Sequence, residues 1–298
     1  MILALTGATG FVGGHVVRRA VEAEHQVRAL ARRPQPPRDG VTWIAGALDD
    51  AAALAALVEG ADAVIHIAGV VNAPDRAGFV AGNIAGTQAI VAATAPGTRF
   101  VHVSSLSARE PQLSIYGWSK REAEAVVAAA PLDWDMVRPP AIYGPGDMDM
   151  LDLFRFARRG VALTPPAGRL SVIHADDLAR LLVALAAAPA TRAIYEVDDA
   201  RDGAWTHKGF TSAIGAAVGR RVRPIALPRA LLRVGARIDR LARGKGARLT
   251  ADRVAYFCHP DWTVDVTKRP PAALWVPQIA TETGLRETAE SYRAAGLL

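Results

Sequence analysis

The chain has 298 residues, of which 51% are hydrophobic, enough to bury one large core or one core and a smaller lobe. Its single cysteine, Cys258, excludes an intramolecular disulfide framework and favours a reducing, cytoplasmic compartment; we expect neither a signal peptide nor a bilayer-spanning segment. The net charge is +6, but no aromatic residues alternate with the basic ones, which argues against nucleic acid as a partner.

The first predicted elements are a buried strand over residues 2–5, a glycine-rich turn, and a helix over residues 11–23. The turn has the pattern Gly-x-x-Gly-x-x-Gly. Its glycines allow a tight turn and a close backbone approach, and the N–H groups at the start of the helix face an anion. The alternative is an ordinary glycine-rich loop. We predict a phosphate cradle, whose candidate residues are Thr6, Gly7, Thr9, Gly10, Phe11, Val12 and Gly13.

Apolar strand-like runs then alternate with helical patterns as far as about residue 200. The predicted strands are 26–30, 42–45, 63–67, 100–104, 136–138 and 194–197, and the predicted helices are 51–58, 84–95, 119–130 and 178–188. This alternation is typical of an α/β protein with a doubly wound parallel sheet. Beyond residue 200 helices are predicted at 205–218, 228–242 and 279–295. We expect a nucleotide-binding domain over 1–200, with a substrate segment interleaved at about 140–180, and a smaller, mainly helical substrate cap over 201–298.

The pentapeptide 116–120 places Tyr116 and Lys120 one helical turn apart on the same face. A free phenol has a pKa of about 10, so acid–base work near neutral pH requires about 4 kcal/mol of selective phenolate stabilisation. A cation a few ångströms away can supply much of it. The alternative is a surface tyrosine and lysine that share this spacing by chance.

Together, the glycine-rich turn and the Tyr-x-x-x-Lys pair resemble the extended branch of the short-chain dehydrogenase/reductase superfamily, the epimerase/dehydratase-like members, over roughly the first 180 residues. The resemblance implies a Rossmann fold in which Ser105 binds the substrate carbonyl and Tyr116 transfers the proton. Lys120 would hold the nicotinamide ribose and lower the pKa of Tyr116. Asn83 would organise a proton-relay water, or alternatively cap the following helix.

The same resemblance places Leu48, Ala68, Gly69 and Pro139 beside the cofactor, with Leu48 contributing its backbone. His66, which precedes the loop of Ala68 and Gly69, is expected to be a core histidine. No spacing of histidine, cysteine or carboxylate residues indicates a metal site.

The residues at and beyond the end of the second predicted strand indicate which dinucleotide binds. An NAD site generally has a carboxylate there, which accepts a hydrogen bond from the ribose 2′-OH. In this chain no acidic residue lies between Gln26 and Arg38. Arg28, Arg32 and Arg33 cluster instead. This favours a 2′-phosphate and therefore NADP, with Arg32 the first candidate and Arg33 the second. NAD is the alternative, since 31 arginines make such clusters common.

The sequence at residues 138–147 differs between groups of enzymes within the superfamily. Sugar-nucleotide enzymes generally carry an asparagine where this chain has Ala141. The stretch is more similar to that of 3β-hydroxysteroid dehydrogenases and dihydroflavonol reductases. The resemblance implies an NAD(P)-dependent oxidoreductase that interconverts a ketone and a secondary alcohol, on an apolar, keto-lipid or steroid-like molecule. The alternatives are a nucleotide-sugar epimerase or dehydratase and a non-catalytic NAD(P)-binding accessory or regulatory protein.

The last feature is a basic amphipathic stretch over residues 227–248. One stripe of it is apolar (Leu227, Leu231, Val234, Ile238 and Leu241), and its cations are Arg229, Arg233, Arg237, Arg240, Arg243, Lys245 and Arg248. Such a helix can lie on an anionic membrane, so the enzyme could be peripheral at the inner face of the membrane. Alternatively the apolar stripe packs on the protein itself. The chain is expected to be a monomer or a homodimer.

Overall fold

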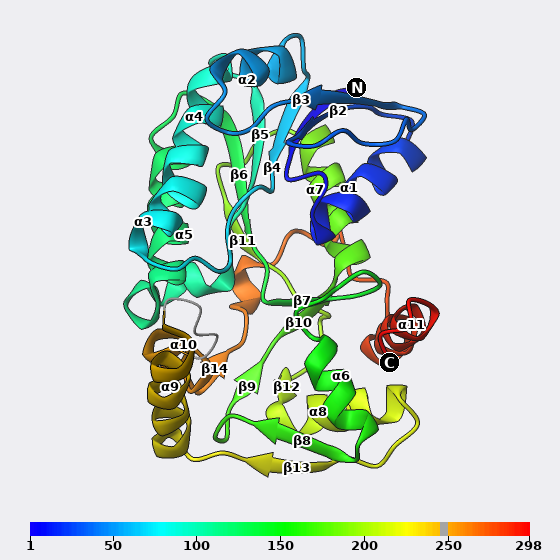
Figure 1. Cartoon of the computed structure of the whole chain (residues 1–298). Coiled ribbons are helices and arrows are strands. Elements are labelled where there is room, and N and C mark those ends of the chain that lie inside the picture. The colour runs from blue at the N-terminus through cyan, green and yellow to red at the C-terminus, as the bar shows by residue number, and fades with distance from the viewer. Residues whose placement is uncertain (245–249) are drawn as a thin grey trace. The chain divides into compact units, whose positions relative to one another are not determined.

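The computed structural model describes residues 1–244 and 250–298, which form two compact units (Figure 1). Unit 1 comprises residues 1–139, 176–197 and 266–276, and unit 2 comprises residues 140–175, 198–265 and 277–298. Each unit is thus assembled from three separate segments of the chain. Whether separate domains fold over 1–200 and 201–298 stays a prediction. Lys245 and Arg248 of the basic stretch lie outside the described residues.

Unit 1 is built on a seven-stranded sheet in which every neighbouring pair of strands is parallel, as predicted. The strand order is β11-β6-β5-β4-β1-β2-β3. The strands are β1 (Ile2–Thr6), β2 (Gln26–Ala31), β3 (Val41–Ala45), β4 (Ala63–His66), β5 (Arg99–Val103), β6 (Asp133–Arg138) and β11 (Ile194–Glu196). All residues of β4 and β5 are buried, because helices cover both faces of the sheet.

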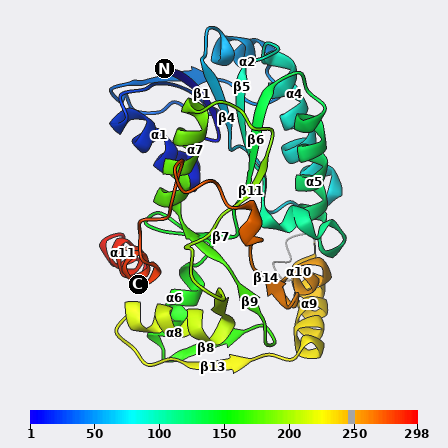
Figure 2. The ribbon, with the colours of Figure 1, turned by 180° about the vertical axis from the view of Figure 1, so that it is seen from behind.

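The helices of unit 1 cover the sheet in two layers. Figures 1 and 2 show α2 (Ala51–Val58), α4 (Gly86–Ala93) and α5 (Ile115–Ala128) on one face, and α1 (Phe11–Glu22) and α7 (Ala175–Ala187) on the other. Unit 1 also contains shorter helical segments: α3 (Arg76–Phe79), η1 (Val80–Ala85), η2 (Leu106–Arg109), η3 (Pro111–Leu113) and η5 (Val266–Lys268). The core between α2, α4, α5 and the sheet includes Leu54, Val64, Ile90, Phe100 and Met136.

Two helices of unit 1 differ from the sequence prediction: α5 begins four residues earlier, and α4 (Gly86–Ala93) begins two residues later. Helix α5 starts at Ile115, since the Ser114 hydroxyl caps it by accepting a hydrogen bond from the Gly117 N–H at 2.9 Å. The helix predicted at 84–95 is preceded by α3 and by a π-helical turn, η1. As a result, Tyr116 lies in the first turn of α5, and Asn83 lies in η1.

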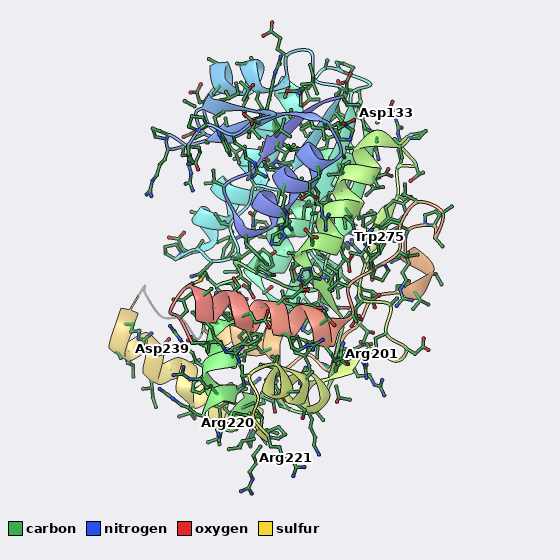
Figure 3. The ribbon with its side chains drawn as sticks, turned by 90° about the vertical axis from the view of Figure 1, so that its right-hand side faces the viewer. Asp133, Arg201, Arg220, Arg221, Asp239 and Trp275 are labelled. Atoms are coloured by element: carbon green, nitrogen blue, oxygen red, sulfur yellow. The ribbon has the colours of Figure 1, made fainter. Side chains whose placement is uncertain are left out.

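Residues 266–276 join unit 1 through Trp275, whose indole N–H donates to the Asp177 carbonyl at 3.0 Å (Figure 3). The neighbouring carbonyl of Val276 accepts a hydrogen bond from Arg180 at 3.0 Å. These contacts tie the segment to α7.

Unit 2 combines helices with three small sheets. The helices are α6 (Leu151–Arg158), α8 (His207–Ala217), α9 (Arg229–Arg243), α10 (Ala251–Phe257) and α11 (Thr281–Ala294). The sheets pair β7 (Ala141–Tyr143) with β10 (Val172–His174), β8 (Val161–Thr164) with β13 (Arg223–Ala226), and β9 (Arg169–Leu170) with β12 (Trp205–Thr206) and β14 (Asp261–Trp262). The core of the unit includes Tyr143, Phe154, Phe210, Leu285 and Tyr292. Helices α8, α9 and α11 are the predicted ones, whereas the strands are too short to leave a periodic pattern.

Among the described residues, no helix is both long and apolar enough to cross a membrane.

Candidate active site

The glycine-rich turn after β1 has the geometry of a phosphate cradle. Gly7 has a φ of +75°, and a Cβ there would lie 2.7 Å from the Ala68 nitrogen, so only glycine fits. A Cβ at Gly13 would collide with the Gly7 carbonyl oxygen, so α1 packs directly on the turn. Gly10 precedes α1, and no side chain in the described part of the chain caps the helix. The N–H groups of the first turn, which includes Phe11 and Val12, can therefore bind a pyrophosphate.

Thr6 joins this turn to the loop that follows β4. Its buried Oγ1 lies 2.6 Å from Nδ1 of His66 and accepts a hydrogen bond from the Ala68 N–H at 3.3 Å. The Thr6 side chain therefore fixes the two loops, while Thr9, in the exposed part of the turn, has access to a ligand. The structure brings Ala68 next to Gly7, and it places Gly69 beside Asn83 and Lys120.

Lys120 reaches the carboxyl end of β5 from α5. Its Nζ donates to the Val103 carbonyl at 2.7 Å, and the residue is only 5% exposed. A Cβ at Gly69 would lie 3.7 Å from this Nζ, so the loop after β4 also meets Lys120. Burial lowers the pKa of Lys120 to about 8, while the nearby Glu124 carboxylate opposes the shift. A buried cation thus lies beside the predicted cofactor loop.

Tyr116 and Ser105 lie half-buried near this lysine. Tyr116 is one turn before Lys120 on α5, with its ring 6.3 Å from that of Phe79. Ser105 follows β5 directly, and its Oγ accepts hydrogen bonds from the N–H (3.2 Å) and the Oγ (2.9 Å) of Ser107. Because Ser105 accepts both bonds, its own proton can be donated to a substrate oxygen.

Gly117 explains how α5 approaches the turn that carries Ser105. A Cβ at Gly117 would lie 2.6 Å from the Ser107 carbonyl oxygen. Only glycine allows the first turn of α5 to pack against η2 this closely. The glycine after Tyr116 is therefore a packing requirement of the site.

Asn83 holds the loop after β4 to α5. Its Oδ1 accepts from the Val70 N–H at 2.7 Å, and its Nδ2 donates to the Val70 carbonyl at 3.0 Å and to Ser119 Oγ at 2.8 Å. The alternative that Asn83 caps the following helix is wrong, because Ala85 precedes α4 and no side chain caps it. The relay-water role stays a prediction.

A buried ion-pair network behind the site was not predicted from the sequence. Glu124 accepts hydrogen bonds from Nε and Nη2 of Arg138, both at 2.7 Å, and from Ser104 Oγ at 2.6 Å. Arg138 also donates to Glu196 at 3.4 Å. These residues tie α5 to the carboxyl ends of β5, β6 and β11. The signal in the sequence is that Glu124 follows Lys120 by four residues, on the same helix face.

His66 and His102 stack with ring centroids 5.3 Å apart, and the charge of Lys120 acts on both rings. His66 is within hydrogen-bond distance of Thr6 and, at 3.0 Å, of Thr87, and burial followed by the Lys120 charge lowers its pKa to about 3. Burial and the charges of Lys120 and His66 also lower the pKa of His102, whose ring nitrogens have no hydrogen-bond partner among the described residues. Both rings are therefore neutral at physiological pH, and His66 is the core histidine that was expected.

The arginines of β2 and of the segment after it separate in the structure. The Arg28 guanidinium donates to the Glu59 carbonyl at the end of α2, whereas Arg32 and Arg33 are exposed beyond the end of the strand. Arg28 is thus not part of a cluster with the other two.

The remaining cofactor candidates, Leu48 and Pro139, lie in loops at the carboxyl ends of strands. Leu48 is half-buried after β3, and the buried Pro139 accepts a hydrogen bond from the Leu106 N–H at 2.9 Å. Within the part of the chain that the structure describes, no cluster of residues could hold a metal ion.

A family model and several known proteins match this chain over much of its length. A family model described as NAD(P)H-binding matches residues 7–189. A ceramide reductase of Caulobacter vibrioides is 39% identical, over 100% of this chain and 96% of the relative. A 2-alkyl-3-oxoalkanoate reductase of Stenotrophomonas maltophilia is 30% identical, over 99% of this chain and 100% of the relative. Human 3 beta-hydroxysteroid dehydrogenase type 7 is 31% identical, over 52% of this chain and 54% of the relative.

Among solved structures, that of gox2253 superposes with a TM-score of 0.79 at 20% identity, covering 100% of this chain and 99% of the other. At this identity the likeness concerns the fold.

Proposed function

Because this chain belongs to the extended short-chain dehydrogenase/reductase superfamily of NAD(P)-dependent oxidoreductases, we propose that it reduces the ketone of a long-chain, ceramide-like lipid to a secondary alcohol. The observation that carries the reaction type is the position of Lys120. Its ammonium is buried at the carboxyl end of β5, one helical turn from Tyr116. A buried cation is costly, and its benefit here is to favour a phenolate and to bind polar groups of a ligand.

Three residues have separate roles in the proposed reduction. Ser105 donates a hydrogen bond to the ketone oxygen and orients it. Tyr116 gives its proton to this oxygen while the carbonyl carbon gains a hydride, and solvent then returns a proton to Tyr116. Lys120 stabilises the resulting phenolate and binds the ribose hydroxyls. A reduced nicotinamide cofactor, when bound, would supply the hydride.

The cofactor fits the chain's own residues. The cradle formed by Gly7, Gly10 and Gly13 would bind the pyrophosphate, and Ala68 and Gly69 would line the nicotinamide half. We propose NADP rather than NAD, because Arg32 is exposed beyond β2 and can pair with a 2′-phosphate. Arg33 is the second candidate for the same contact.

The substrate class is supported by the relatives that match nearly the whole chain. One is named a ceramide reductase and the other a 2-alkyl-3-oxoalkanoate reductase, and both names describe molecules with alkyl chains. The Ala141 position is consistent with this class, since it lacks the amide that sugar-nucleotide enzymes generally place there. The proposed substrate is therefore a lipid with a ketone near its polar end.

A cofactor-coupled assay tests the proposal. The purified chain is mixed with NADPH and the oxo form of a ceramide in detergent micelles, and both cofactor loss and alcohol formation are measured. We expect turnover with NADPH and slower turnover with NADH. Interconversion of UDP-sugars without net cofactor consumption would instead identify an epimerase. Binding of NADPH with no turnover of any ketone would identify a non-catalytic protein.

A further inference from the structure

Helix α9 of unit 2 exposes an apolar stripe. Leu231, Val234, Ile238 and Leu241 are 58%, 50%, 61% and 87% exposed. Their spacing of three, four and three residues places them on one face of the helix. Isolated exposed apolar side chains are ordinary, but a continuous row of large ones marks an interaction surface. The expectation that this stripe packs on the protein itself is therefore not what the structure shows.

A different face of α9 connects the helix to its unit. Ala236 is buried, Leu232, Gly235 and Asp239 are half-buried, and α9 packs against α10 (Figures 1 and 2). At about 100° per residue, Ile238 lies about 160° around the helix from Ala236. The helix thus attaches by one face and presents the apolar stripe on another.

The remaining face is basic. Arg229, Arg233 and Arg237 recur every four residues and are exposed. The acidic residue of the helix, Asp239, lies on the protein-facing side, where it pairs with Arg243 at 3.2 Å (Figure 3). The protein-facing, basic and apolar faces therefore each occupy about a third of the circumference.

We propose that α9 binds the surface of an anionic lipid bilayer, with the apolar stripe inserted among the acyl chains and the arginines on the lipid phosphates. Adjacent apolar and basic faces are the arrangement of a helix that lies in a membrane interface. Membrane binding through α9 is independent of the proposed reaction and involves no catalytic residue. If the reaction is also correct, the enzyme works at the surface where a lipid substrate resides.

A second copy of the chain is a poorer occupant of the stripe. Two α9 helices packed symmetrically would bring their arginines together, and like charges repel. The 15 residues of α9 also hold only two heptads, whereas coiled coils need three or four. A bilayer of anionic lipids offers both an apolar phase and the opposite charge.

Vesicle co-sedimentation of the full chain tests the proposal. Vesicles of equal parts phosphatidylglycerol and phosphatidylcholine are compared with phosphatidylcholine alone, at about 50 mM and about 500 mM salt. We expect binding to the anionic vesicles that weakens at high salt. Absence of binding at low salt, or equal binding to both vesicles, would overturn the proposal.

Paired variants separate charge from apolar contact. Arg233→Gln with Arg237→Gln should weaken vesicle binding about 25-fold, at about 5-fold per cation. Ile238→Gln with Leu241→Gln should weaken it at least about 10-fold. The matched controls, Arg220→Gln with Arg221→Gln and Val266→Gln with Val276→Gln, are exposed elsewhere and should bind like the unmodified chain.

Two further measurements make the outcome specific. Turnover of a short, water-soluble ketone should be the same in all of these variants, so a failure of the proposed reaction leaves the vesicle result interpretable. Analytical ultracentrifugation then addresses a second copy. A dimer that the Ile238→Gln, Leu241→Gln variant converts to a monomer would show that another copy covers the stripe, and would overturn the bilayer proposal.

Discussion

Lys120 in unit 1 and the arginines of α9 in unit 2 are cations in opposite environments. Lys120 is 5% exposed, donates to a backbone carbonyl and lies near Glu124. These contacts define the position of its Nζ atom. Arg229, Arg233 and Arg237 are exposed to solvent on one face of α9. Removing a cation from water is costly, whereas an exposed one costs almost nothing. The effect of a buried charge therefore depends on its own position and contacts, whereas the effect of exposed charges depends on how many of them lie together.

The largest effect should come from the buried network. Glu124→Gln keeps the side-chain size but removes the charge that Arg138 pairs with, so we expect the free energy of unfolding to fall by about 3 kcal/mol. Urea denaturation measures it. The matched control is Asp152→Asn, whose exposed pair with Arg155 at 3.3 Å should contribute within about 0.5 kcal/mol. An equal loss of unfolding free energy in the two variants would contradict the prediction that the buried charge contributes more than the exposed one.

Next comes the proton donor. Tyr116→Phe keeps the ring and its packing near Phe79 but removes the hydroxyl, so kcat should fall at least about 100-fold while cofactor affinity is retained. The control is Tyr195→Phe, a buried tyrosine on β11 that hydrogen-bonds Thr191 at 2.8 Å and should keep normal turnover. If Tyr116→Phe retained most of the activity on a verified substrate, the assignment of roles would be wrong.

The exposed cation after β2 should have a smaller and more selective effect. Arg32→Ala should weaken NADP binding by about 1.5–3 kcal/mol, as expected for a charge-assisted hydrogen bond, and leave NAD binding unchanged. Calorimetric titration of both cofactors measures the difference. Arg28→Ala is the control, because its guanidinium is engaged by Glu59. Tighter binding of NAD than NADP by the unmodified chain would disprove the cofactor assignment.

The smallest effect, per pH unit, concerns Lys120 itself. Its pKa of about 8 lies below the value of about 10.4 in an unfolded chain, so the unfolded state binds more protons between these values. The free energy of unfolding should rise with pH in this window, by up to about 1.4 kcal/mol per unit. Cofactor affinity should fall over the same range, because the ammonium charge is lost.

Urea denaturation and cofactor titration from about pH 7 to about pH 10 measure both trends of this prediction. Lys120→Met is the control, because the other titrating groups are common to both proteins. If the two proteins had parallel pH profiles, the lysine would not titrate in this window.

Much of unit 1 could be predicted from the sequence. Strands β1, β2, β4 and helix α2 agree with the predicted ranges to within one residue, because continuous apolar runs and helical periods are local signals. The start of α5 was missed because the cap Ser114 lies outside the apolar pattern. The short strands of unit 2 were missed because two to four residues contain no period.

The sequence alone determined the chemistry available to the protein: a glycine turn between strand and helix, a tyrosine and lysine one turn apart, and a helix with separate apolar and basic stripes. These are local properties, set by residue type and spacing along a few turns of chain. Only the tertiary structure decided the environment of each group. It buried Lys120, joined Arg138 to Glu124 and Glu196 across distant segments, and left the apolar stripe of α9 in solvent. Burial and pairing depend on which distant elements pack together, and the spacing of residues along the chain does not indicate that packing.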